Sequence, residues 1–243
     1  MENSTNIVND IKKIVEENQV QVIKIGDRTF TTKDLYEVKP IKNTANKIVF
    51  NDLSSIATIV KRESGKFFAP LYIFIEDEKT VSVLTSLDDE KDREAPYVAK
   101  ADDDRFRFGR EYDYESFVIA IRSLFVQNND TTELLNTLKK VSTVESVETE
   151  DDGVTQKVVA KAGSSLAESL KVAPIRKLAP YRTFIEVEQP ESEFLFRLFR
   201  NNQFALFEAD GGAWKIKAKA HIRAYFEKAL KAEIDSGVVV VLG

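Results

Sequence analysis

Basic side chains next to aromatic ones are the first feature of this sequence that could bind a ligand. Residues 105–110 read RFRFGR, which places Arg105, Arg107 and Arg110 beside two phenylalanines. In a strand, Arg105 and Arg107 would share one face and the phenylalanines the other. Arginines hold phosphates through paired hydrogen bonds, and solvated aromatic rings stack on bases. The ordinary alternative is an amphipathic strand with buried phenylalanines, and the acidic run 102–104 weakens any positive field.

Two further groups carry basic or aromatic residues at a useful spacing. Tyr181 and Arg182 stand in the run PYRTF, where ring stacking and phosphate contacts could hold a nucleotide. Neighbours on a strand point to opposite faces, so a shared site would require a subunit interface. Lys215, Lys219 and Arg223 recur every four residues and form one helical stripe. That stripe is either a solvated face or a contact for an acidic partner or a phosphate-bearing ligand.

The stretch FEADGGAW contains a glycine pair that could form an anion site. Asp210, Gly211 and Gly212 stand between an alternating strand and a helix that starts near Trp214. Phosphates bind at such strand-to-helix turns because helix N-termini present free N–H groups. Asp210, however, is placed to accept those N–H groups as an N-cap, and its carboxylate would repel a phosphate. We therefore predict a capped turn, with Trp214 anchoring the helix on the sheet.

Several chemistries lack the residues that they need. The sequence has no cysteine and one histidine, His221, which excludes disulfides and thiolate nucleophiles and argues against zinc. It contains no Walker A, G-x-G-x-x-G or G-x-S-x-G motif. Acidic runs at 88–90, 102–104 and 151–152 keep a carboxylate-metal hydrolase as a minor alternative, although such runs are usually solvated loops. We expect no metal, no cofactor and no enzymatic activity.

Hydrophobic periodicity predicts an α+β fold of mainly antiparallel sheets with helices packed on one face. Helices are predicted at 5–17, 53–63, 113–125, 131–141 and 214–230, and the second should be capped by Asn51 or Asp52. Asp77-Glu78-Lys79 should make a hairpin turn between the strands at 71–76 and 80–86. Strands are predicted in a hairpin over 20–32 and at 71–76, 80–86, 96–101, 153–162, 181–188, 193–199, 204–209 and 238–242. Residues 163–179 read as a looser connection. Strands followed by a helix occur in both parts of the chain, so two similar strand-strand-strand-helix halves are one interpretation.

The same pattern divides the chain into three segments that could form one compact unit. Residues 1–62 form a helix, hairpin and helix, and residues 63–142 form a first antiparallel sheet with helices. Residues 143–243 form a second antiparallel sheet with a C-terminal helix and strand.

Composition limits the class of protein. The 243 residues are 43% hydrophobic and 31% charged, with a net charge of -5, which suits a core under an ionic surface. Non-specific DNA binding is disfavoured because such proteins usually carry a basic balance. The first residues are polar, and no run of about 18 apolar residues occurs. We therefore expect no signal peptide, no membrane contact and a cytoplasmic location.

Three runs in the second half carry a family resemblance. They are DDGVTQKVVAKAG at 151–163, LAPYRTFIEVEQPESEFLFRLF at 178–199 and ALFEADGGAWKIKA at 205–218. Over residues 151–230 the chain resembles the YfdQ-like family of phage and prophage proteins, whose function is unknown. The resemblance implies a phage-encoded accessory protein that acts in the cytoplasm of the bacterial host, and it implies no catalytic residues.

These observations favour a non-enzymatic binding protein that acts against host defence. It would sequester a nucleotide immune signal or a host defence protein. Its dispersed arginine, tyrosine and lysine side chains would contact that ligand at the interfaces of a homo-oligomer. One alternative is a single-stranded-DNA-binding accessory in phage recombination or replication. The other is a structural component of the virion.

Overall fold

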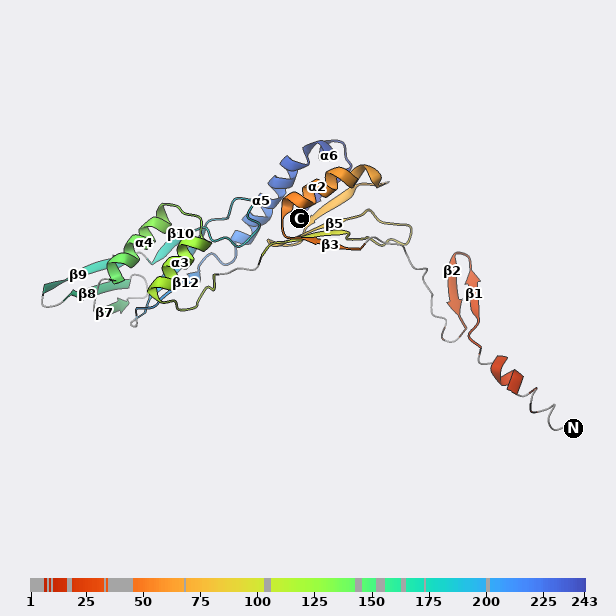
Figure 1. Cartoon of the computed structure of the whole chain (residues 1–243), viewed down its shortest axis with the longest axis horizontal. Coiled ribbons are helices and arrows are strands. Elements are labelled where there is room, and N and C mark those ends of the chain that lie inside the picture. Colours follow the sequence, from red (N-terminus) through yellow and green to blue (C-terminus); the bar gives the residue numbers. More distant parts are fainter. Residues whose placement is uncertain are drawn as a thin grey trace. The chain divides into compact units, whose positions relative to one another are not determined.

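The computed structural model describes residues 7, 9, 11–16, 19–32, 34, 46–67, 69–102, 106–142, 146–151, 156–162, 165–172, 174–199 and 202–243. The chain divides into two compact units, residues 1–45 and residues 46–243, each of which is described by itself (Figure 1). Helices combine with antiparallel and mixed sheets, which confirms the predicted α+β fold. No helix among the described residues is long and apolar enough to cross a membrane.

The amino-terminal unit contains a short helix and a hairpin. Residues 11–16 are helical, within the helix predicted at 5–17. Strands β1 (Val22–Ile25) and β2 (Arg28–Thr31) pair antiparallel, with Ile23 opposite Phe30. Gly26 makes the turn at a φ of 62°, a conformation that glycine adopts without strain. The hairpin predicted around Gly26-Asp27 is thus confirmed.

The larger unit contains a five-stranded mixed sheet with the order β13-β4-β5-β6-β3. Its strands are β3 (Ile48–Phe50), β4 (Leu71–Ile75), β5 (Thr80–Leu84), β6 (Tyr97–Lys100) and β13 (Val239–Leu242). The three central strands pair antiparallel, as predicted from the tight turn between β4 and β5. The two edge strands add in parallel, because each comes from a distant part of the chain.

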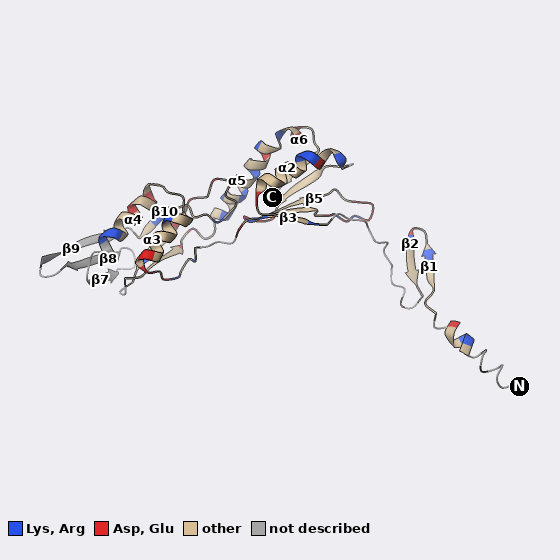
Figure 2. Cartoon of the chain, in the orientation of Figure 1, with Lys and Arg blue, Asp and Glu red and all other residues tan. Residues whose placement is uncertain are grey.

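Helix α2 (Leu53–Glu63) follows β3 and starts at a strong cap. Asp52 Oδ1 accepts a hydrogen bond from the N–H of Ser55 at 2.6 Å, as the sequence predicts for a helix preceded by Asn51-Asp52. The last turn carries Lys61 and Arg62, which suit the negative end of the helix dipole (Figure 2). A 3-10 turn at Ser64–Lys66 then leads to β4.

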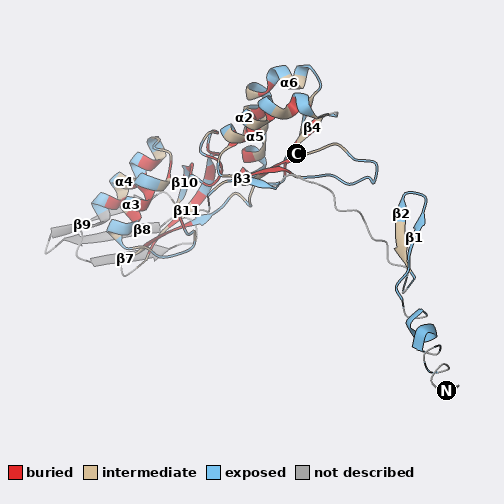
Figure 3. Ribbon diagram, turned by 45° about the vertical axis from the view of Figure 1, so that its right-hand side comes forward, coloured by how far each residue is buried: buried red, intermediate tan, exposed pale blue. Residues whose placement is uncertain are grey.

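One core lies between this sheet and its helices. Helix α5 (Trp214–Ala229) packs on the same face as α2 and is followed by α6 (Lys231–Asp235). Leu53, Ile56 and Val60 of α2 and Ile222 and Phe226 of α5 are fully buried there (Figure 3). Phe184 and Val187, from the segment before β11, complete this core.

A second core is largely aromatic. Helices α3 (Tyr114–Leu124) and α4 (Asn129–Ser142) pack on a sheet of the order β10-β11-β12. Its strands are β10 (Ile175–Leu178), β11 (Ser192–Leu198) and β12 (Phe204–Glu208). Phe117 of α3 contacts the rings of Phe196 and Phe204 at centroid distances of 6.0 and 5.7 Å. Interlocked rings of this kind fix the helices on the sheet.

A third sheet has the order β7-β8-β9, with β7 (Ser146–Asp151), β8 (Gln156–Ala162) and β9 (Ser165–Val172). All its pairs are antiparallel. The looser connection predicted at 163–179 is wrong, because most of it forms β9 and β10. The periodic signal there is weak, and the strands are specified by pairing with β8 and β11, which local periodicity does not reveal.

Two other strand predictions are wrong. Residues 181–188 alternate in sequence but form bends and turns, because the buried side chains of this segment pack in different directions. The described part of RFRFGR, residues 106–110, is a turn that lies along the edge of β12, with Gly109 N–H donating to Leu206 O at 2.8 Å. The C-terminal strand is confirmed as β13, although only Val239 in it is buried because it forms an edge of the sheet.

Candidate functional site

The irregular segment 181–189 connects the two cores of the larger unit. Tyr181 N–H donates to Leu124 O at 2.9 Å, which ties the segment to the end of α3. At its other end, His221 Nδ1 of α5 lies 2.7 Å from Glu188 O. Inside the segment the buried Gln189 amide donates to Phe184 O and Val187 O at 2.9 and 3.1 Å. Hydrogen bonds from a side chain thus satisfy carbonyl groups that would pair with a neighbouring strand if the segment were itself a strand.

Arg182, a predicted ligand-binding residue, is buried in this segment with an exposure of 2%. Its guanidinium donates to Glu208 Oε1 at 2.6 Å and to Ser192 Oγ. Its Cζ lies 3.9 Å from the centre of the Trp214 ring, within range of a cation–π contact. The charge of Arg182 is therefore committed to joining β11, β12 and the start of α5.

Residues of the same segment also line a pocket of about 800 Å³. The residues that line it come from the start of α2, the end of β6, the end of α3 and the segment itself. They are Asn51, Asp52, Ser54, Ala101, Asp102, Ser123, Leu124, Tyr181, Thr183, Phe184, Ile185 and Glu186. Three of these described residues are acidic and none is basic. Its volume lies in the range of sites for small ligands.

Glu186 lines the pocket and also holds the start of α2. Oε1 accepts hydrogen bonds from the N–H groups of Leu53 and Ser54 at 2.7 and 3.3 Å, at the start of α2. Oε2 is buried and has no hydrogen-bond partner among the described residues. A buried carboxylate oxygen without a donor is costly, so this side chain would gain a hydrogen bond if it turned toward a donor bound in the pocket.

The pKa shifts of two neighbouring groups bear on the charge at this place. Hydrogen bonds from Ser54 and Ser55 lower the pKa of Asp52, which keeps this carboxylate ionised at neutral pH. The pKa of Tyr225 on α5 is raised, first by burial and then by the charges of Glu186 and Asp52. A second, more open hollow of about 660 Å³ shares Asn51, Asp52, Ala101 and Asp102 with the pocket, and Lys100 also lines it.

The apolar part of the pocket is also exposed. Tyr181 is 45% exposed and Ile185 79% exposed, although both are large hydrophobic side chains. Leu124 and Phe184 continue this surface into the pocket. A lining that combines carboxylates with aromatic and aliphatic side chains suits a ligand with a positive group beside an apolar portion.

The arginines of RFRFGR lie elsewhere. Arg107 and Arg110 are exposed beside Tyr112, whose hydroxyl accepts from the N–H of Arg107 at 2.9 Å. Arg110 Cζ lies 5.7 Å from the centre of the Tyr112 ring. Phe106 is buried in the aromatic core, as the amphipathic alternative predicts. Arg105 lies outside the described residues.

The basic stripe of α5 is largely occupied by structural contacts. Lys215 Nζ pairs with Glu78 Oε1 at 3.2 Å. Arg223 donates to Val241 O at 3.3 Å and to Gly243 O, and thus holds the edge strand β13. Lys219, between them, is half-buried. The structure does not bring these three side chains to the pocket residues.

The glycine turn before α5 is capped as predicted. Asp210 accepts hydrogen bonds from the N–H groups of Gly212 and Trp214, both at 3.1 Å, although the N-cap position itself is Ala213. Gly211 and Gly212 have φ values of 61° and 84°, where glycine is favoured. Trp214 is buried beneath Arg182, so it anchors the helix through that side chain.

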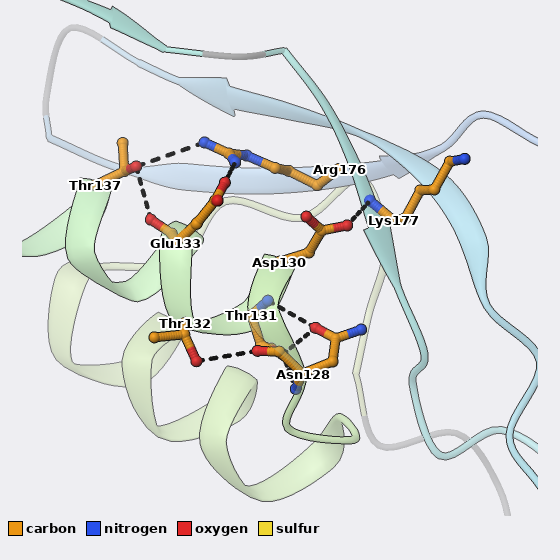
Figure 4. Close-up of polar contacts among 8 residues, drawn as sticks. All are labelled: Asn128, Asp130, Thr131, Thr132, Glu133, Thr137, Arg176 and Lys177. Atoms are coloured by element: carbon orange, nitrogen blue, oxygen red, sulfur yellow. Dashed lines mark hydrogen bonds and ion pairs between the residues drawn. The ribbon is translucent and has the colours of Figure 1, made fainter.

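A further buried arginine belongs to the packing of α4 on β10. Arg176 donates to Glu133 Oε2 at 3.2 Å and to Thr137 Oγ1 at 3.5 Å (Figure 4). Asp130 Oδ2 accepts from the N–H of Lys177, and Asn128 Oδ1 accepts from the N–H of Thr131 at the start of the helix. Every contact in this network joins two secondary elements, caps a helix or lies within α4, so we assign it to the fold.

Sequence reasoning found Tyr181 and missed Glu186. Glu186 stands in FIEVEQP, which reads as an ordinary alternating strand, and its helix partner Leu53 is 133 residues away. Asp52 is predicted as a helix cap and Asp102 as part of an acidic run, without a link between them. Among the described residues, no group of three or more histidine, cysteine, aspartate or glutamate side chains could hold a metal ion.

The chain matches no protein-family model, no curated protein and no solved structure.

Proposed function

We propose that this chain is a binding protein that captures a cationic group in the pocket beside Glu186. The ligand carries an ammonium or guanidinium group next to an apolar portion. The observation that supports this most directly is the buried Oε2 of Glu186, which lacks a hydrogen-bond donor. A charged donor placed there would form a short, charge-assisted hydrogen bond.

The negative charge of the pocket favours one of the two ligands expected from the sequence, a host defence protein, over the other, a nucleotide immune signal. Asp52, Asp102 and Glu186 would repel the phosphates of a nucleotide signal. Arg182 and Arg223, which were expected to bind such phosphates, are engaged with Glu208 and with β13. A basic segment of a partner protein fits these charges better.

The resemblance to YfdQ-like phage proteins supplies the context of the proposal. On that basis the chain is a phage-encoded accessory protein in the host cytoplasm, and its partner is a host defence protein with an exposed lysine or arginine. A free polyamine or agmatine presents the same chemistry, so the experiment below includes both sources.

Calorimetry of the full chain tests the proposal with four probes. These are agmatine, spermidine, a short peptide with arginine between leucines, and a panel of cyclic and ADP-ribose-type nucleotides. We expect the arginine peptide to bind and the nucleotides to give no heat. Tight nucleotide binding, or no binding by any cationic probe, would overturn the proposal.

Two matched variants locate the site. Glu186→Gln keeps the shape of the side chain but removes its charge, so peptide affinity should fall at least about tenfold. Glu188→Gln removes an exposed charge two residues away and should leave the affinity unchanged. A gel shift at two salt concentrations covers the single-stranded-DNA alternative, since phosphate contacts weaken steeply with salt.

A further inference from the structure

The amino-terminal unit exposes an unusual amount of aliphatic surface. Ile7, Ile11, Ile14 and Val15 are spaced to form one helical stripe, and each is more than half exposed. In the hairpin, Val22 and Ile25 of β1 are 66% and 62% exposed (Figure 3). None of the described residues in this unit is buried.

Such a unit is too small to be stable without cover. A helix of a few turns and a single two-stranded hairpin are each marginal in water. Chains of about 40 residues usually need a disulfide, a metal or an oligomeric partner to fold. Cysteine is absent from the sequence, so a disulfide cannot supply the stability. A protein surface that covers the aliphatic side chains can.

The charge of the unit identifies the kind of surface. Residues 1–45 contain seven acidic and seven basic side chains, whereas the remaining residues carry the whole net charge of -5. A nucleic acid or an anionic membrane would select a basic face. A neutral unit with charges of both signs can approach a second copy of itself without net repulsion, as a two-fold interface requires.

The exposed area also agrees with a pair of chains. Burying one aliphatic side chain removes roughly 60–120 Å² of apolar surface. The six exposed aliphatics on the helix stripe and on one face of β1 average a little over half exposure, which corresponds to roughly 200–400 Å² per chain. A standard interface buries about 450 Å² of apolar area on each partner, so a somewhat smaller area agrees with a dimer that dissociates on dilution.

We propose that the amino-terminal unit pairs with the same unit of a second copy of this chain and so makes the protein a dimer. The aliphatic stripe of the helix and the face of β1 that carries Ile23 and Ile25 form the interface. The dimer presents two copies of the larger unit to a partner, which raises the effective concentration of the binding pocket.

Sedimentation equilibrium of the full chain tests this pairing. The wild type should sediment as a dimer that dissociates on dilution. Ile11→Asp with Val15→Asp should weaken the association at least about a hundredfold, because two charges would be buried. Lys12→Gln with Glu16→Gln changes two residues on the polar side of the same helix, keeps the unit neutral and should leave the dimer intact. A monomeric wild type, or equal effects of the two pairs, would overturn the proposal.

A cross-linking measurement keeps the test independent of helix stability. The chain has no cysteine, so Ile11→Cys introduces a single thiol. A short bis-maleimide should link two copies efficiently at Ile11→Cys and poorly at Lys13→Cys, on the polar side. Equal linking at the two positions would contradict a stripe-to-stripe interface.

Discussion

Arg182 and Glu186 stand four residues apart in one irregular segment, and the fold treats their charges in opposite ways. Arg182 is buried, and its contacts with Glu208, Ser192 and Trp214 all lie within the protein. Glu186 uses one oxygen to cap α2 and leaves the other, buried, beside a pocket. Burial alone therefore does not distinguish a structural charge from one suited to binding.

The difference lies in what surrounds each charge. Around Arg182 the ring of Trp214 and the carboxylate of Glu208 fill the space that a ligand would need. Around Glu186 the pocket adds two more carboxylates, Asp52 and Asp102, and no basic residue. An opposite charge in direct contact neutralises a buried charge, whereas several carboxylates that line the same pocket attract a cation.

The largest effect should follow from removing the structural charge. Arg182→Met leaves Glu208 without its buried partner and removes the cation–π contact with Trp214. We expect the free energy of unfolding to fall by about 3 kcal/mol. Urea unfolding followed by far-UV circular dichroism measures it, with the exposed Arg107→Ala as the control. A loss below about 1 kcal/mol would show that Arg182 contributes no more to the free energy of unfolding than an exposed arginine does.

A smaller effect on stability should distinguish the oxygen of Glu186 that caps α2 from the charge of the carboxylate. Glu186→Ala removes the acceptor of the Leu53 and Ser54 N–H groups, which should cost about 1 kcal/mol, close to the effect of Asp52→Ala. Glu186→Gln keeps an amide oxygen as acceptor and should change stability by less than about 0.5 kcal/mol. Thermal unfolding of the three variants gives the comparison. A glutamine variant as unstable as the alanine one would mean that the charge itself serves α2.

The pH dependence of Tyr225 tests whether Glu186 is charged inside the fold. The folded-state pKa of Tyr225 is raised above 10.0, so the protonated phenol contributes stability below pH 10. That contribution is lost as the pH rises through the folded-state pKa. Glu186→Gln removes one of the two charges that raise this pKa, after burial, and should lower it. Tyrosinate absorbance, with Tyr225→Phe to identify the signal, measures the shift; an unchanged value would contradict the proximity of the two groups.

Sequence patterns predict those elements that are stabilised by residues close together in the sequence. The hairpin at β1 and β2, the cap at Asp52 and the turn at Asp210 depend on residues within a few positions, and all three are confirmed. The strand predicted at 181–188 is wrong because the conformation of this segment depends on Gln189 and on distant groups such as Glu78. Glu186 could not be identified for the same reason, since its role exists only where α2 meets this segment.

The smallest effect should come from the second cation at the Trp214 ring. Lys215 Nζ lies 5.8 Å from the centre of that ring and also pairs with Glu78, but its side chain is 55% exposed. Solvent screens such a pair, so Lys215→Ala should cost less than about 0.5 kcal/mol in the same urea experiment. Arg182 and Lys215 thus share an aromatic partner and differ mainly in exposure. Equal losses for Arg182→Met and Lys215→Ala would show that the ring contact, rather than burial of the charge, determines the stability of this junction.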